Sequence, residues 1–182
     1  MIRCVFLLLT VIIMCQNADV LAADGPAKDT PELLVLSNYV GTWDVAITSK
    51  DFPFPNGESS TSWVLDGRFV QQTGVLKSDD GSKSIKVTTL MTYDSEKKMY
   101  RMWSFQSNGS TSEGTGKWNE KTRTMTSTSR QDGTTTTITA KFSDNGIEEW
   151  LIVTTNQNNE VVGRTAGTNT RRKNNKNDAI NR

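Results

Sequence analysis

The amino-acid sequence predicts an all-β protein: one antiparallel barrel of about nine or ten strands, preceded by a short N-terminal helix. Three observations predict it. Apolar and polar residues alternate with period two after Gly41, turn-forming dipeptides recur at intervals of roughly 8–14 residues, and helical periodicity is missing up to about Thr170. Hairpins that follow one another in sequence order leave two sheet edges, which closure into a barrel pairs. A two-sheet sandwich is the alternative.

The first 22 residues have the order of features typical of a secretory signal peptide. Arg3 supplies a positive charge, residues 5–15 form an apolar run, and the small residues Ala22 and Ala23 follow. The run is shorter than the about 20 apolar residues that a permanent membrane span needs. We expect cleavage after Ala22, with Ala23 as the alternative, and a secreted or periplasmic protein with no integral membrane segment.

The cysteines and histidines limit the available chemistry. Both cysteines, Cys4 and Cys15, belong to the predicted signal peptide, and the chain contains no histidine. The mature protein therefore forms no disulfide, no Ser-His-Asp or Cys-His catalytic site and no common zinc site, and we expect neither metal nor cofactor. Loss of Arg3 and Asp19 leaves the net charge at +1, which argues against a nucleic-acid partner.

The remaining chain divides into three parts. Residues 23–30 form a polar lead, residues 31–173 form the barrel domain, and residues 174–182 form a basic tail predicted to be disordered, with contact to anionic lipid or polymer as the alternative. The domain begins with a predicted helix: Thr30 supplies an N-cap hydroxyl and Pro31 occupies the first turn. The apolar residues Leu33, Leu36 and Val40 follow on one helix face.

Strands are predicted wherever alternation runs between two turn signals. The expected runs cover residues 43–48, 63–69, 90–93, 100–105, 122–127, 134–142, 149–154 and 161–170. The turn signals are Asp80-Gly81, Asp94-Ser95, Asn108-Gly109, Asn119-Glu120, Asp132-Gly133, Asn145-Gly146 and Asn158-Asn159. Segments 93–100 and 118–125 share one hairpin pattern. Gly114 and Gly116 lie on one face of a further strand, where they permit a bend.

Several motifs together carry a family resemblance. They are Gly41-Thr42-Trp43 after the short helix, Asp66-Gly67-Arg68-Phe69-Val70, Tyr93-Asp94 with Lys97-Lys98 and Tyr100, Trp103, Gly116-Lys117-Trp118-Asn119 and Thr170-Arg171-Arg172-Lys173. In this order, over Pro31 to Lys173, the chain is similar to the domain-of-unknown-function 1579 family of exported bacterial proteins with a lipocalin/calycin-like barrel. The resemblance implies a fold and a compartment. It implies no catalytic residue.

The resemblance also implies one structural role and one absence. In barrels of this kind the tryptophan of the first motif closes one end, and a late arginine lies across its ring. Trp43 and Arg171 match these positions, with Arg164 as the second choice. The related nitrobindin-like group holds haem through a histidine, which this chain lacks. Tyrosine can also ligate haem iron, with Tyr93 or Tyr100 as the candidates, and we expect no haem.

Candidate ligand contacts come from the aromatic residues. A barrel lumen takes small molecules, and five tryptophans are many for this length. We therefore predict binding of a small, largely apolar molecule by Trp63, Trp103, Trp118, Tyr100, Phe52 and Phe54. Core packing is the alternative for the tryptophans. The Phe52-Pro53-Phe54-Pro55 loop is expected either to cover the barrel mouth or to pack on its rim.

Two other functions are weighed against ligand binding. The first is an envelope-associated interaction module with a filled barrel and no ligand. The second is a hydrolase with a carboxylate pair drawn from Glu113, Glu148, Glu149 and Asp94. Adjacent Glu148 and Glu149 point to opposite faces of a strand, so they cannot form such a pair. We expect these acids to lie in solvent and the protein not to be an enzyme. The sequence does not indicate an oligomeric state.

Overall fold

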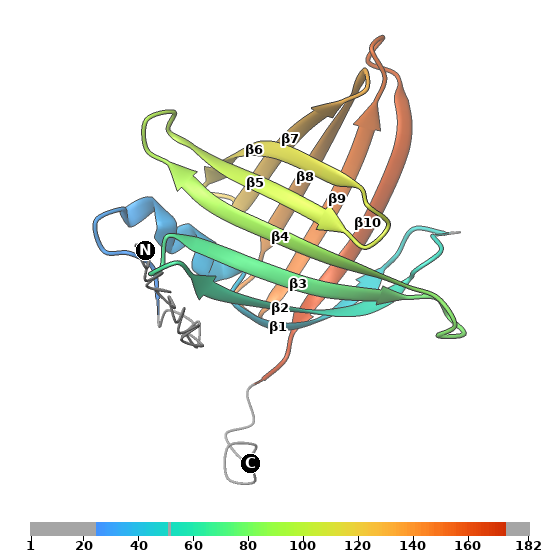
Figure 1. The fold of residues 1–182 in the computed structure, drawn as a ribbon, viewed down its shortest axis with the longest axis horizontal. Helices are drawn as coiled ribbons and strands as arrows, with labels where there is room; N and C mark the ends of the chain where they lie inside the picture. The colour runs from blue at the N-terminus through green and yellow to red at the C-terminus, as the bar shows by residue number, and fades with distance from the viewer. Residues whose placement is uncertain (1–24, 51, 174–182) are drawn as a thin grey trace, which may run out of the picture.

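The computed structural model describes residues 25–50 and 52–173, over which ten antiparallel strands close into a barrel (Figure 1). The strands are β1 (Gly41–Ile47), β2 (Asn56–Val64), β3 (Phe69–Lys77), β4 (Ser84–Asp94), β5 (Met99–Gln106), β6 (Thr111–Asn119), β7 (Thr124–Gln131), β8 (Thr134–Phe142), β9 (Ile147–Thr155) and β10 (Val161–Arg171). β1 pairs with both β2 and β10, which closes the sheet. The predicted barrel is confirmed, and the sandwich alternative is wrong.

Two predicted segments, the signal peptide at 1–22 and the basic tail at 174–182, lie outside the described residues. Within the described ranges, helices of the length and apolarity needed to cross a membrane are not found.

The turn dipeptides predicted from the sequence all lie at the connections between paired strands, with Asp94 and Asn119 as the last residues of β4 and β6. The β4–β5 and β6–β7 hairpins share the predicted design. Asp94 and Asn119 each accept a hydrogen bond from a backbone N–H three residues later, over 2.9 and 3.2 Å. Lys98 and Arg123 then take positive φ angles of 52° and 50°. An Asx side chain thus organises both turns in the same way.

One strand prediction is wrong. Residues 63–69 are not one strand: β2 ends at Val64, a turn follows, and β3 begins at Phe69. Leu65, Asp66 and Gly67 have φ angles of 51°, 55° and 76°, a left-handed run that no strand contains. At Gly67 a Cβ atom would lie 2.2 Å from the Gly25 carbonyl oxygen, because the chain before the helix crosses this turn. Trp63 and Phe69 therefore point to opposite faces of the sheet.

The N-terminal helix η1 (Pro31–Asn38) is confirmed but is a 3₁₀ helix. Leu33, Leu36 and Tyr39 are buried at intervals of three residues, which matches the three residues per turn of that helix. The N-cap prediction for Thr30 is wrong, since its hydroxyl makes no capping hydrogen bond. That hydroxyl instead faces Asp29, at 3.4 Å.

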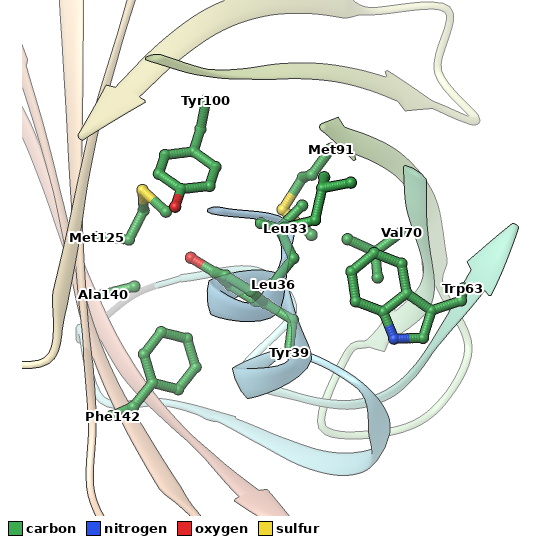
Figure 2. Packing of buried hydrophobic residues seen from close by; sticks show 10 residues of the cluster. All are labelled: Leu33, Leu36, Tyr39, Trp63, Val70, Met91, Tyr100, Met125, Ala140 and Phe142. Atoms are coloured by element: carbon green, nitrogen blue, oxygen red, sulfur yellow. The ribbon is translucent and has the colours of Figure 1, made fainter. Parts of the chain in front are cut away.

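Helix η1 fills one end of the barrel, which we call the closed end (Figure 2). Its three buried side chains lie between those of β2–β4 on one side and those of β7 and β8 on the other. Tyr39 packs edge-on against Phe142 with ring centroids 4.8 Å apart. The Tyr100 hydroxyl donates to the Glu32 carbonyl oxygen over 2.9 Å. The strand contribution to this cluster is Trp63, Val70, Met91, Tyr100, Met125, Ala140 and Phe142.

Trp43 and Arg171 join the helix to the barrel at this end. Trp43 is 1% exposed, and its indole nitrogen donates to the Tyr39 carbonyl oxygen over 2.8 Å. The Arg171 guanidinium carbon lies 4.4 Å from the centroid of the Trp43 ring, within the range of a cation–π contact. Arg171 also donates to the carbonyl oxygens of Asn38 and Val40. Arg164, the second choice, lies exposed on β10.

Candidate functional site

The half of the barrel away from η1 encloses a cavity of about 580 Å³. Inward positions of seven strands, β3 to β9, and Asn169 of β10 line most of it, because side chains alternate between the two faces of each strand. Most lining groups are hydroxyls and amides. They are Gln72, Thr89, Ser104, Gln106, Ser112, Ser127, Thr128, Ser129, Gln131, Thr134, Thr136 and Asn169, beside Tyr39, Met91, Met102, Gly114, Asp132, Ile138, Glu148, Trp150 and Ile152.

A smaller cavity of about 160 Å³ adjoins this one. Gln72, Trp150 and Asn169 line both, so they lie at the boundary between the two. Ser59 lines the smaller cavity. The hydroxyl oxygens of Ser59 and of nearby Thr61 are buried and have no hydrogen-bond partner among the described residues. Buried hydroxyls without partners are uncommon and costly. Both hydroxyl oxygens are enclosed by protein atoms, so they add no exposed hydrogen-bonding group to the lumen.

Three side chains form a hydrogen-bonded chain at the inner end of the large cavity. The Trp150 indole nitrogen donates to Asn169 Oδ1 over 3.0 Å, and Asn169 Nδ2 donates to Glu148 Oε2 over 2.7 Å. Glu148 and Asn169 face each other across the β9–β10 pair, where both point inward. Because Asn169 bonds both neighbours, it fixes the Trp150 ring and the Glu148 carboxyl group relative to one another.

Glu148 is a buried glutamate with a raised pKa. It is 5% exposed. Burial raises the pKa of its carboxyl group from 4.5 to about 7, although the hydrogen bond from Asn169 and the positive charge of Arg171 oppose the shift. The carboxyl group therefore changes protonation state near neutral pH. A carboxyl group with these properties in a cavity is a candidate for ligand recognition.

Gly167 makes room for the Trp150 ring. It lies opposite Trp150 on β10, and a Cβ atom there would be 2.3 Å from Trp150 Cζ2 and 2.6 Å from the Ala46 carbonyl oxygen. Side-chain atoms do not approach one another so closely. The indole therefore lies over a position that only glycine can occupy without displacement of the ring or the β1 backbone.

We expect Gly167→Ala to displace the Trp150 ring and to destabilise the fold by about 1–3 kcal/mol, the usual cost of overpacking. The measurement is near-ultraviolet circular dichroism together with chemical denaturation. Gly81→Ala is the control, because nothing lies within 4 Å of a Cβ atom there, although its φ of 69° adds local strain. An unchanged aromatic spectrum in Gly167→Ala would show that the ring does not depend on this glycine.

The predicted ligand residues do not line the large cavity. Trp63 and Tyr100 belong to the closed-end cluster and are 4% and 5% exposed. Trp118 is half-buried, packs against Phe142 at a centroid distance of 6.1 Å and donates from its indole nitrogen to Glu120. These three aromatic residues lie inside the barrel, but they fill the end occupied by η1.

The other three predicted ligand residues lie elsewhere. Trp103 is on the outer face of β5, where its ring contacts Phe69 at 6.4 Å and the Arg101 guanidinium at 4.8 Å. Phe52 and Phe54 are half-buried in the β1–β2 connection, at the opposite end of the strands from η1. They lie near the open end without lining the described cavity. Of the five tryptophans, Trp150 is the one that lines the cavity.

The four acids considered for catalysis are separated by the sheet. Glu148 points inward, whereas Glu149, Glu113 and Asp94 occupy outward positions. Glu113 and Asp94 both face Arg101, Glu113 in a close ion pair and Asp94 at 4.0 Å. The expectation that all four lie in solvent is wrong for Glu148, which is buried. In the described part of the chain, no cluster of three or more acidic residues could hold a metal ion.

Asn169, Gln72 and Gly167 are site residues that the sequence did not single out, and Glu148 was expected in solvent. One available signal concerned Glu148. Its neighbour Glu149 must face the other side of the strand, so one of these two acids had to point inward. Nothing in the local pattern distinguished them, because the inner face of the open half is rich in polar residues.

Comparison with known proteins supports the fold. A similar solved structure is that of the S-type phycobiliprotein lyase CPES from Guillardia theta, with a TM-score of 0.57 and 15% sequence identity, covering 75% of this chain and 90% of that chain. At this identity the likeness concerns the fold, and it confirms the lipocalin-like all-β barrel. No known family model and no curated protein matches the chain. Membership of the 1579 family stays a prediction.

Proposed function

We propose that this chain is an exported binding protein that holds a small amphipathic molecule in the open half of its barrel. The observation that carries the proposal is the cavity of about 580 Å³, which falls within the roughly 300–1,000 Å³ typical of small-molecule sites. Its lining side chains extend from paired strands and are therefore held in place before a ligand arrives. The lipocalin-like barrel supports the same function class.

The chemistry of the lining refines the predicted ligand. An apolar molecule would bury the hydroxyl and amide groups of the lumen without partners, at a cost in free energy for each group. Trp150, Met91 and Met102 provide apolar contact surface in the same cavity. The lining therefore favours a molecule with a flat apolar part and several hydrogen-bonding groups over a purely hydrocarbon one.

We further propose that the protein is secreted or periplasmic, and that it binds its ligand without converting it. Export is supported by the charged, apolar and small-residue segments in residues 1–22. Binding without conversion is supported by the separation of the carboxyl groups: the sheet divides Glu148 from Glu113, Glu149 and Asp94. The other acid of the cavity lining, Asp132, precedes β8, whereas Glu148 lies opposite Phe142 at the far end of that strand. A glycosidase-type pair needs two carboxyl groups facing one substrate.

Filling the cavity tests the proposed function. Ser129 of β7 points into the lumen, opposite Gly114 on β6 and Thr136 on β8. We expect Ser129→Leu to weaken binding of a lumenal ligand at least tenfold, since the added side chain occupies part of the ligand volume. The protein is purified from its native host, native mass spectrometry identifies co-purifying small molecules, and tryptophan fluorescence follows their rebinding.

The matched control is Thr126→Leu, which adds a leucine on the exposed outer face of the same strand. It is expected to leave rebinding unchanged. Equal affinity in Ser129→Leu and the unmodified protein would place the ligand outside the lumen. A clean apo mass, with no fluorescence response to a panel of lipids and sugars, would count against lumenal binding altogether.

A further inference from the structure

Glu148 is a buried acid without a cationic partner in the described part of the chain. No described lysine or arginine nitrogen lies within 4.0 Å of its carboxyl oxygens. Its one hydrogen bond, from Asn169, uses Oε2. Glu148 lines the large cavity, so Oε1 is available to accept a hydrogen bond from a molecule in the lumen. Buried carboxylates are normally paired with a cation.

The other charges around the cavity have the same sign. Asp132, at the β7–β8 turn, is the second charged residue of the lining, and the described lining contains no lysine or arginine. Arg171 lies beyond Glu148 at the closed end. It lies over the Trp43 ring and donates to two carbonyl oxygens of the segment at the end of η1. A negatively charged ligand would therefore find two acids and no available cation.

From this geometry we propose that the bound molecule carries a protonated amine, which pairs with Glu148 at the inner end of the lumen. The inference rests on the proposed binding function and specifies its ligand class. Two aromatic rings lie beside this position, Trp150 and Tyr39. Aromatic rings attract a cation that approaches their faces. Asn169 is a positioning residue here, because it holds both the carboxyl group and the indole.

The titratable and charged groups near Glu148 come from two elements. Tyr39, at the end of η1, has a pKa well above its ordinary value, because of burial and then the charge of Glu148, so its hydroxyl stays protonated. Arg171 of β10 supplies a positive charge that favours ionised Glu148. From β8 the facing residues are Phe142 and Ala140, which do not titrate. Glu148 is therefore the group near this position that changes charge around neutral pH.

The test compares three probes that share a naphthylmethyl group and differ in the substituent on its methylene carbon: 1-naphthylmethylamine, 1-naphthylmethanol and 1-naphthylacetate. Affinities for the full chain are measured by isothermal titration calorimetry near pH 8. We expect the ammonium probe to bind roughly 10–100-fold more tightly than the alcohol, and the carboxylate probe most weakly. Glu148→Gln, which keeps the size of the side chain and an acceptor for Asn169, should abolish the preference for the ammonium probe.

Two further measurements separate charge pairing from a structural role. Lowering the pH from about 8 to about 6 should weaken ammonium binding to the unmodified protein, because Glu148 takes up a proton. It should leave ammonium binding to Glu148→Gln unchanged. Glu149→Gln removes a charge from the outer face of the same strand and should bind all three probes as the unmodified protein does.

The outcomes distinguish this inference from the proposed function. If the alcohol and ammonium probes bind equally, and Glu148→Gln changes neither, the amine inference is wrong while lumenal binding stands. If Ser129→Leu leaves the affinity of every bound probe unchanged, the probes bind outside the lumen and both proposals are contradicted. If none of the three probes binds, the amine inference is overturned. The proposed function is then tested separately, by the Ser129→Leu experiment with ligand that co-purifies from the native host.

Discussion

Replacing Trp43 by alanine is expected to lower the free energy of unfolding by about 3–5 kcal/mol, the range measured for large buried aromatic residues. The indole is 1% exposed, so its removal leaves a cavity at the closed end. The variant also loses the hydrogen bond to the Tyr39 carbonyl oxygen and the cation–π contact with Arg171. The end of helix η1 would then lose its hydrogen bond to β1. Chemical denaturation of the purified chain measures the change.

Two variants serve as controls for the Trp43 experiment. Trp43→Phe keeps an aromatic ring and removes the indole N–H, and we expect it to cost about 1–2 kcal/mol because the Tyr39 carbonyl oxygen loses its donor. Trp103→Ala removes a tryptophan from the outer face of the barrel and should cost clearly less than Trp43→Ala. Equal losses for Trp43→Ala and Trp103→Ala would contradict the role of Trp43 in closing the barrel.

Replacing Glu148 by glutamine is expected to stabilise the protein by about 3 kcal/mol near pH 8 and to have little effect near pH 4.5. The pKa of this carboxyl group is about 7 in the folded protein and 4.5 as an ordinary value. Because the folded value is the higher one, the protonated acid favours folding. This contribution is fully present below pH 4.5 and is lost as the pH rises through 7. Glutamine stays neutral throughout and avoids the cost of the buried charge.

The measurement is denaturant unfolding of both proteins at a series of pH values, and the readout is their difference in stability. Exposed acids whose pKa values are lowered by partners, such as Asp44 beside Arg172, titrate equally in both proteins and cancel. Glu149→Gln, on the outer face, should show no pH-dependent difference. A Glu148→Gln effect that is constant across the series would show that the carboxyl group does not titrate near pH 7.

The closed end of the barrel was largely predictable from the sequence. Here buried positions carry large apolar side chains and outer positions carry polar ones, so alternation marks the inner face. Gly41 opens the first strand with a positive φ angle and Trp43 follows two residues later, and the hairpin turns are marked by Asx and glycine residues. These signals depend on neighbours in the chain and need no knowledge of the rest of the fold.

The open half was not predictable in the same way. Its inner face carries serine, threonine and glutamine, much as the outer face does, so hydrophobicity no longer distinguishes the two. Trp103 shows the reverse case: an apolar ring lies on the outer face because Phe69 and Arg101 pack against it there. The aromatic residues chosen as ligand contacts therefore fell at the closed end, on the outer face or in a loop.

By itself the sequence determined the all-β class, most of the strands and the turns, because these follow from alternation and turn chemistry. The contact between Trp43 and Arg171 was implied by the family resemblance. Only the tertiary structure decided that Glu148 is buried and Glu149 exposed. Burial of Glu148 depends on Tyr39, which is far from it in the chain and reaches it only once β1 pairs with β10. Asn169 faces Glu148 across the β9–β10 hairpin. The desolvation of Glu148 results from the closed barrel, so it cannot be predicted from the local sequence pattern.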